Sequence, residues 1–190
     1  MHCERCEQSA VMHITLAGKG MVASQFHLCE ECAGKYLASP PPGPEKMSQP
    51  LPNAAGEVQI EVDKVIISEI HDKQVIMLRE VQGSRVFPLV TGMFEATTVN
   101  RILMNVPSPR PLTHDAWLAS TEALGAKVES ACIHDLHDFI YLTDLRLVQG
   151  SKKVTVDLRP SDALVVALKT GAPFLVTERL LSQPRENQSP

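Results

Sequence analysis

The chain has 190 residues, of which 44% are hydrophobic, 21% charged and 4% aromatic, and its net charge is −4. This acidic balance excludes binding of nucleic acid through a globally basic surface, so any such site must be local. No apolar stretch approaches the ~20 residues of a spanning helix. The first ten residues, MHCERCEQSA, contain no apolar signal-peptide core. We expect a cytoplasmic protein with reduced thiols and no membrane partner.

Four of the five cysteines form two CxxC pairs near the N-terminus, Cys3 with Cys6 and Cys29 with Cys32. Two such pairs supply the four thiolates of a tetrahedral site, which predicts structural Zn²⁺. The alternatives are two disulfides or free thiols. Four protein ligands leave no open position for catalysis. Between the pairs, VMHITL and MVASQFHL predict a hairpin with AGKG as its turn, and a helix follows near Glu30.

The stretch CERCEQSAVMHITL…FHLCEECA, within residues 3–33, resembles the N-terminal zinc finger of bacterial activator proteins that accompany protein-arginine kinases. The resemblance implies a role in protein contact or stabilisation, so we expect a protein partner for residues 1–38. A zinc ribbon that reads nucleic acid is the alternative.

Composition divides the remainder of the chain. Residues 39–56 hold six of the 14 prolines and predict a linker. Residues 57–182 form the predicted main domain, and 183–190 a disordered tail. Within this domain the sequence repeats at an offset of 67: VQGS occurs at Val81–Ser84 and again at Val148–Ser151. This predicts an internal duplication.

Each predicted copy consists of three strands followed by a helix. The expected strands span 58–69, 75–81 and 85–90, then 127–135, 140–148 and 153–158. The expected helices start near Gly92 and Ser161, the second one ending at Gly171. The fold class is therefore α+β, with helices on a mainly antiparallel sheet that could close into a barrel.

A further helix is expected between the copies, from His114 to Leu124. Thr113 is its predicted N-cap, just as Ser161 is for the later helix. Its predicted buried stripe consists of Trp117, Leu118, Thr121 and Leu124. The lone Cys132 lies in an apolar strand and is expected to be a buried small hydrophobe.

Polar residues concentrate in three places: PRPLTHD at Pro109–Asp115, the run from His134 to Asp138, and VDLRPSDA at Val156–Ala163. The first and third could be explained by helix capping and ion pairing alone. The second could bind a divalent metal or form a solvated turn. Functional and structural explanations therefore both stay open at this point.

The stretch from about Val62 to Leu181 resembles the bifunctional nuclease domain family. The resemblance rests on TGMFEA at 91–96, PRPLTHD at 109–115, LGAKVESACIHDL at 124–136, and DLRPSDALVVAL with APFLV within 157–176. It implies cleavage of DNA or RNA. By position, the polar motif residues of the family fall on Glu95, Arg110, His114, Asp115, Asp157, Arg159 and Asp162.

Two hypotheses follow from these residues. In the first, the protein is a nuclease: the carboxylates hold Mg²⁺ or Mn²⁺, His114 transfers a proton, and Arg110 and Arg159 clamp a phosphate. In the second, it is a non-enzymatic module whose zinc finger contacts a protein and whose α+β domain binds a ligand or oligomerises. We also expect a homo-oligomer. The two hypotheses differ in whether the motif residues share one open site.

Overall fold

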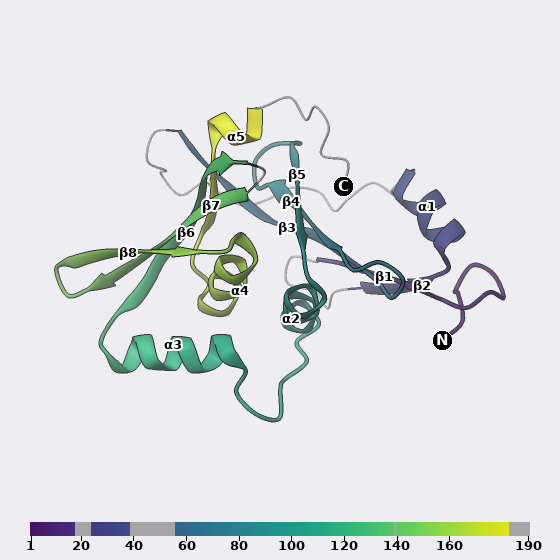
Figure 1. Cartoon of the computed structure of the whole chain (residues 1–190), viewed down its shortest axis with the longest axis horizontal. Helices are drawn as coiled ribbons and strands as arrows, with labels where there is room; N and C mark the ends of the chain where they lie inside the picture. Colours follow the sequence, from purple (N-terminus) through teal and green to yellow (C-terminus); the bar gives the residue numbers. More distant parts are fainter. Residues whose placement is uncertain (18–23, 39–55, 139, 183–190) are drawn as a thin grey trace.

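The computed structural model describes residues 1–17, 24–38, 56–138 and 140–182. Its strands are β1 (Met12–Leu16), β2 (Ser24–Leu28), β3 (Glu57–Ser68), β4 (Gln74–Glu80), β5 (Val86–Thr91), β6 (Lys127–His137), β7 (Ile140–Gln149), β8 (Lys152–Leu158) and β9 (Phe174–Thr177). Its helices are α1 (Glu30–Ala38), α2 (Met93–Leu103), α3 (Thr113–Ala123), α4 (Pro160–Thr170) and α5 (Glu178–Ser182) (Figure 1).

The described strands form one sheet in the order β2-β1-β3-β9-β6-β7-β8, with β4 paired to β3 and β5 to β4. Every pair is antiparallel except β6 with β9. The mixed α+β class with a mainly antiparallel sheet is thus confirmed. Within the described ranges β8, β5 and β2 each have a single strand neighbour, so the sheet is open there and not a barrel.

Strand β3 joins the two parts of the sheet. Its segment Ile60–Ile66 pairs with β4 along one edge. On the opposite edge its first residues, Glu57–Ile60, pair with β9, and its last, Lys64–Ser68, pair with β1. The hairpin that precedes the cysteine-bearing helix therefore extends the sheet of the main domain.

Helices α2 and α4 pack on one another and on one face of the sheet (Figure 1). The residues of α4 from Ala163 to Ala167 are all buried, which explains the continuous apolar run ALVVA. A second, smaller core cluster includes Ile14, Leu28 and Tyr36 beside the N-terminal cysteines. The division into residues 1–38 and 57–182 stays a prediction, since the two clusters share a sheet.

The element order three strands, then a helix, occurs twice, as β3-β4-β5-α2 and β6-β7-β8-α4. Met93 and Pro160, which begin α2 and α4, are separated by the same 67 positions as the two VQGS segments. This agreement supports an internal duplication, which stays a prediction.

Several local predictions need correction. The N-cap of α3 is Leu112, not Thr113, because Asp115 accepts a hydrogen bond from the Leu112 backbone amide. In α4 the N-cap is Arg159, and Ser161 lies buried inside the helix. Pro160 explains the shift, since proline favours the first helical position.

The predicted buried stripe of α3 is only partly correct. Leu118 is buried, and Trp117 and Thr121 are partly buried, but Leu124 is 73% exposed at the end of the helix. By contrast, Gly171 ends α4 as expected, with φ of 71° in the left-handed region that glycine favours.

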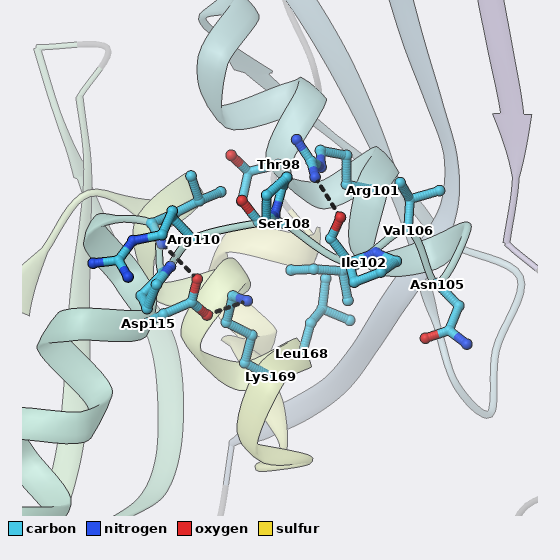
Figure 2. A pocket seen from close by; sticks show the side chains of 14 residues that line it. Thr98, Arg101, Ile102, Asn105, Val106, Ser108, Arg110, Asp115, Leu168 and Lys169 are labelled. Atoms are coloured by element: carbon cyan, nitrogen blue, oxygen red, sulfur yellow. Dashed lines mark hydrogen bonds and ion pairs between the residues drawn. The ribbon is translucent and has the colours of Figure 1, made fainter.

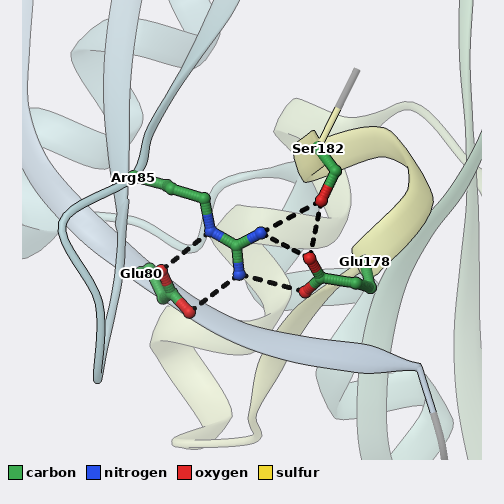
Figure 3. A network of polar contacts seen from close by, with 4 residues as sticks. All are labelled: Glu80, Arg85, Glu178 and Ser182. Atoms are coloured by element: carbon green, nitrogen blue, oxygen red, sulfur yellow. Dashed lines mark hydrogen bonds and ion pairs between the residues drawn. The ribbon is translucent and has the colours of Figure 1, made fainter. Parts of the chain in front are cut away.

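Arg85 fixes the short helix α5 to the turn between β4 and β5 (Figure 3). Its guanidinium donates to both carboxylate oxygens of Glu80, at 2.9 and 3.0 Å, and also to Glu178. Ser182 completes the network through Glu178 and Arg85. The hydrogen bond from Arg85 lowers the pKa of Glu178 to about 2. The chain end after β9 is thereby held against the sheet.

Two predicted segments lie outside the described residues: nearly all of the linker 39–56, and the tail 183–190. Most of the predicted AGKG turn falls there too. Among the helices that are described, none is long and apolar enough to cross a membrane.

Candidate functional site

The first turns of α2, α3 and α4 meet at one place, which we call the helix corner, made of Glu95, His114, Arg159 and Asp162. Glu95 belongs to the first turn of α2, and Asp162 to the first turn of α4. Helix N-termini carry partial positive charge, which stabilises carboxylates and binds anions. The Glu95 carboxylate lies beside Gly92, the N-cap of α2, where a Cβ would come within 2.8 Å of Oε2.

Hydrogen bonds join the four side chains. Arg159 donates through Nε to Oδ2 of Asp162 at 2.7 Å, and through Nη2 to Oε1 of Glu95 at 2.7 Å. Nε2 of His114 lies 3.1 Å from Oδ1 of Asp162. The contact between His114 and Asp162 unites the PRPLTHD and VDLRPSDA motifs, which lie 48 residues apart in the chain.

The charges of the corner follow from these contacts. Burial opposes ionisation of Asp162, but hydrogen bonds from Arg159 and His114 lower its pKa. Since an ionised carboxylate only accepts hydrogen bonds, Nε2 of His114 carries a proton. The Arg159 side chain is 67% exposed, whereas those of His114 and Asp162 are 20% exposed. The corner thus offers a solvent-facing cation above a half-buried His–Asp pair.

Asp115 points to a different neighbour. Its Oδ1 accepts a hydrogen bond from Nζ of Lys169 at 2.6 Å, and its Oδ2 caps α3 through the Leu112 amide at 2.8 Å. The hydrogen bond from Lys169, followed by that from the amide, lowers the pKa of Asp115. Asp115 therefore has a structural role. The adjacent residues His114 and Asp115 contact different parts of α4, Asp162 and Lys169.

A cavity of about 520 Å³ adjoins the Asp115–Lys169 pair (Figure 2). It lies between the C-terminal half of α2, the loop from α2 to α3, and the C-terminal end of α4. Arg110 lines this cavity, and among the described residues no hydrogen bond or ion pair joins it to the helix corner. The structure thus separates the predicted residues into a corner and a neighbouring cavity.

Asp157 is not brought to the helix corner. It lies in β8 opposite Asp144 of β7. Its neighbours Val156 and Leu158 pack against the core that α4 covers. Because side chains alternate along a strand, Asp157 projects from the other face of the sheet.

The polar residues of the run from His134 to Asp138 also pair with different partners. His134 pairs with Asp144 at 3.4 Å, and Asp135 pairs with Arg179 at 2.6 Å. Cys132 in the same strand is fully buried as expected, and burial raises the pKa of its thiol to about 12.

The four N-terminal cysteines do converge. The sulfur atoms of Cys3, Cys6, Cys29 and Cys32 all lie within 4.8 Å of one another. The Cys6 and Cys29 sulfurs are 3.5 Å apart, and those of Cys6 and Cys32 3.8 Å. Four sulfurs bound to one Zn²⁺ at about 2.3 Å would be about 3.8 Å apart. The cluster can therefore hold a metal ion such as Zn²⁺.

Local electrostatics agree with a cation at this place. Burial opposes ionisation of the Cys3 thiol, yet hydrogen bonds from backbone amides, including that of Arg5, lower its pKa to about 6. The hydrogen bond with Cys29 raises the pKa of Cys32 to about 12. Neighbouring thiols thus resist joint ionisation, and a divalent ion would remove that repulsion.

The sequence analysis missed Lys169 and Arg101. Lys169 follows the apolar run of α4 and meets Asp115 from 54 positions away. Arg101 lies in the last turn of α2, where a basic residue normally complements the helix dipole. Neither has a local signal beyond its charge.

The fold and the site define a class of protein: an α+β chain in which an arginine, a histidine and two carboxylates meet at the starts of three helices. The particular family follows from comparison: a model described as "Bifunctional nuclease domain" matches residues 76–188, and the chain belongs to that family. Two relatives are uncharacterized proteins of Mycobacterium tuberculosis, from strains CDC 1551 / Oshkosh and ATCC 25618 / H37Rv. Each is 32% identical over 125 residues, covering 66% of this chain and 74% of the relative.

Proposed function

We propose that this protein is a nuclease that hydrolyses phosphodiester bonds of DNA or RNA at the helix corner. The observation that carries the proposal is the contact of His114 with Asp162, beneath the exposed guanidinium of Arg159. Membership of the bifunctional nuclease domain family supports the reaction class. Arg110, Asp115 and Asp157 lie outside the corner and have no catalytic role in this proposal.

The corner residues have distinct parts in this reaction. Arg159 can exchange its carboxylate partners for the oxygens of a phosphate, which its planar fork binds in pairs. Asp162 holds the proton of His114 on Nε2, which leaves Nδ1 of a neutral ring as the acceptor. Nδ1 can then take a proton from a water whose oxygen bonds to phosphorus while the bond from phosphorus to the ester oxygen of the leaving nucleotide breaks, and that oxygen takes a proton from solvent. The helix starts stabilise the added negative charge of the transition state.

A divalent cation does not fit the corner in the arrangement described. Nη2 of Arg159 lies 2.7 Å from Glu95 and 3.2 Å from Oδ1 of Asp162, so the guanidinium already occupies the space between the two carboxylates where a cation would bind. Within the described residues, the group of four cysteines is the one cluster with metal-ligand proximity. Assistance by Mg²⁺ or Mn²⁺ stays a prediction.

The test is cleavage of single- and double-stranded DNA and RNA by highly purified protein, with added Mg²⁺, Mn²⁺ or EDTA. His114→Ala and Asp162→Asn should each lower the rate by about 10²–10⁴-fold, the usual contribution of a positioned proton-transfer group. Arg179→Ala, which removes an exposed arginine on α5, is the matched control and should cleave as wild type. Equal cleavage by all four proteins would assign the activity to a contaminant.

A second candidate is a non-enzymatic binding or regulatory module. It is favoured by the partners that Arg159, Glu95 and Asp162 find in one another, since ion pairs of this kind also serve structure alone. We extend the proposal to Zn²⁺ at the cysteine cluster, a protein partner for residues 1–38 and self-association of the chain. Failure of every cleavage assay together with retained zinc would leave this module as the function.

A further inference from the structure

The cavity beside the helix corner has the size and composition of a ligand site. Its volume of about 520 Å³ falls in the range of about 300–1,000 Å³ typical of pockets for small molecules. Its walls are mixed: Ile102, Val106 and Leu168 supply apolar surface, and Thr98, Asn105 and Ser108 supply polar groups. Such a lining suits a ligand with an apolar organic part and a polar end.

The charge of the cavity is opposite to that of the whole chain. Arg101, Arg110 and Lys169 line it, against the single carboxylate of Asp115. The chain as a whole carries −4. A cationic recess in an acidic protein concentrates anions locally and repels them elsewhere.

Not all of these cationic side chains are fully paired with other groups of the protein. Lys169 is held by Asp115, and Arg101 donates one hydrogen bond, from Nη2 to the carbonyl oxygen of Pro107 at 2.8 Å. Arg110 is exposed and has no hydrogen-bonding or ion-pairing partner within the described residues. Figure 2 shows Arg101 and Arg110 on either side of Ser108. Their remaining donors are free to bind an anion.

The loop that carries Arg110 is stiff. Pro107, Pro109 and Pro111 alternate with the other residues of this wall, and each proline fixes its own φ near −65°. The hydrogen bond from Arg101 ties the start of the loop to α2. Little conformational entropy is then lost when a ligand binds, which favours a preformed site.

We propose that this cavity binds a nucleoside monophosphate unit, its phosphate contacting Arg110 and its nucleoside resting on the apolar wall. The inference deepens the proposed nuclease function and rests on it for the source of the ligand. Asp162 of the corner and Lys169 of the cavity are seven residues apart on α4, about 10 Å along the axis. His114 contacts Asp162 and Asp115 contacts Lys169. One nucleic-acid strand can therefore reach both the helix corner and the cavity.

Binding is tested directly, without cleavage. Adenosine 5′-monophosphate and inorganic phosphate are titrated calorimetrically into the full-length protein, and a 5′-labelled single-stranded oligonucleotide is followed by anisotropy. Arg110→Ala should weaken binding of the mononucleotide about tenfold or more, and Arg110→Glu should abolish it. Because Arg110 is exposed and unpartnered, both variants should fold. Arg179→Ala is the matched control and should bind as wild type.

The outcomes separate this inference from the nuclease proposal. If the mononucleotide binds in a manner that depends on Arg110 but the protein cleaves no nucleic acid, the result supports nucleotide binding in the cavity and contradicts the nuclease proposal. Cleavage by wild type with no effect of Arg110→Glu on binding or KM removes the cavity and retains the nuclease. Inorganic phosphate that binds as tightly as the mononucleotide would overturn the nucleoside part. Tighter binding of the oligonucleotide than of the mononucleotide identifies a nucleic-acid strand as the source, and tighter binding of the mononucleotide identifies the free nucleotide.

Discussion

The cysteine cluster and the helix corner are assembled in different ways. The cluster takes its ligands from two CxxC pairs, each of which already places two thiols within reach of one ion. The corner takes its side chains from three helices, and its bonds span 48 and 64 positions of the chain. The first site is a property of local sequence, whereas the second exists only when α2, α3 and α4 are packed together. The two should therefore respond differently to substitution.

The largest effect is expected for Cys29→Ser. Loss of one of four ligands should take the zinc-to-protein ratio from about one to near zero, and with it metal-linked folding energy on the order of 10 kcal/mol. β1 should then detach from β3 and leave residues 64–68 as an open edge prone to association. Hydrogen exchange of β1 and β2 amides, with metal analysis, measures both.

Cys132→Ala is the matched control, since Cys132 lies in β6, apart from the cluster. It should keep the zinc ratio of wild type. Full zinc content in Cys29→Ser would show that the cluster does not depend on four thiolates.

A smaller effect is expected for Leu118→Ala, which tests whether the corner depends on packing. Leu118 is the buried residue of α3. Its truncation should cost about 2 kcal/mol or more and loosen His114 from Asp162. Urea unfolding measures the stability, and Leu124→Ala on the same helix is the control, because Leu124 is 73% exposed. Equal midpoints for the two variants would contradict the packing argument.

The smallest effect is expected for Asp115→Ala, which removes the cap of α3. The free energy of unfolding should fall by about 1 kcal/mol at neutral pH. Because Lys169 and the Leu112 amide lower the pKa of Asp115 in the folded state, its stabilisation is present above the unfolded pKa of about 3.9. It is lost as pH falls through the folded value.

Thermal unfolding between pH 7 and pH 2 measures this difference. The difference in Tm between wild type and Asp115→Ala should be largest at pH 7 and should disappear in acid. Glu122→Ala, an exposed carboxylate on the same helix, should show no such gap. A gap that widens in acid would reverse the assignment of Asp115 as an ionised cap.

Much of the fold could be predicted from alternation and turn residues. The strands from β1 to β8, Gly171 and the burial of Cys132 agree with their local patterns, whereas β9 and α5 were not predicted. Thr113 and Ser161 were wrong as N-caps. Asp115 accepts a hydrogen bond from the Leu112 amide and so makes Leu112 the N-cap of α3, and the ring of Pro160 starts α4 and so makes Arg159 its N-cap. Leu124 was wrong as a buried residue because α3 ends there and packs through Leu118 alone among its fully buried side chains.

The sequence by itself determined the cysteine pairs, the order of strands and helices as far as α4, and the motifs that mark the family. Their information lies in residues close together in the chain, where backbone geometry alone fixes which side chains can meet. Only the tertiary structure decided that His114 meets Asp162 while Asp115 meets Lys169, that Asp157 faces away, and that Arg110 belongs to a cavity. Those placements follow from how α3 packs on α4 and how β8 is oriented in the sheet, and neither is encoded within one segment.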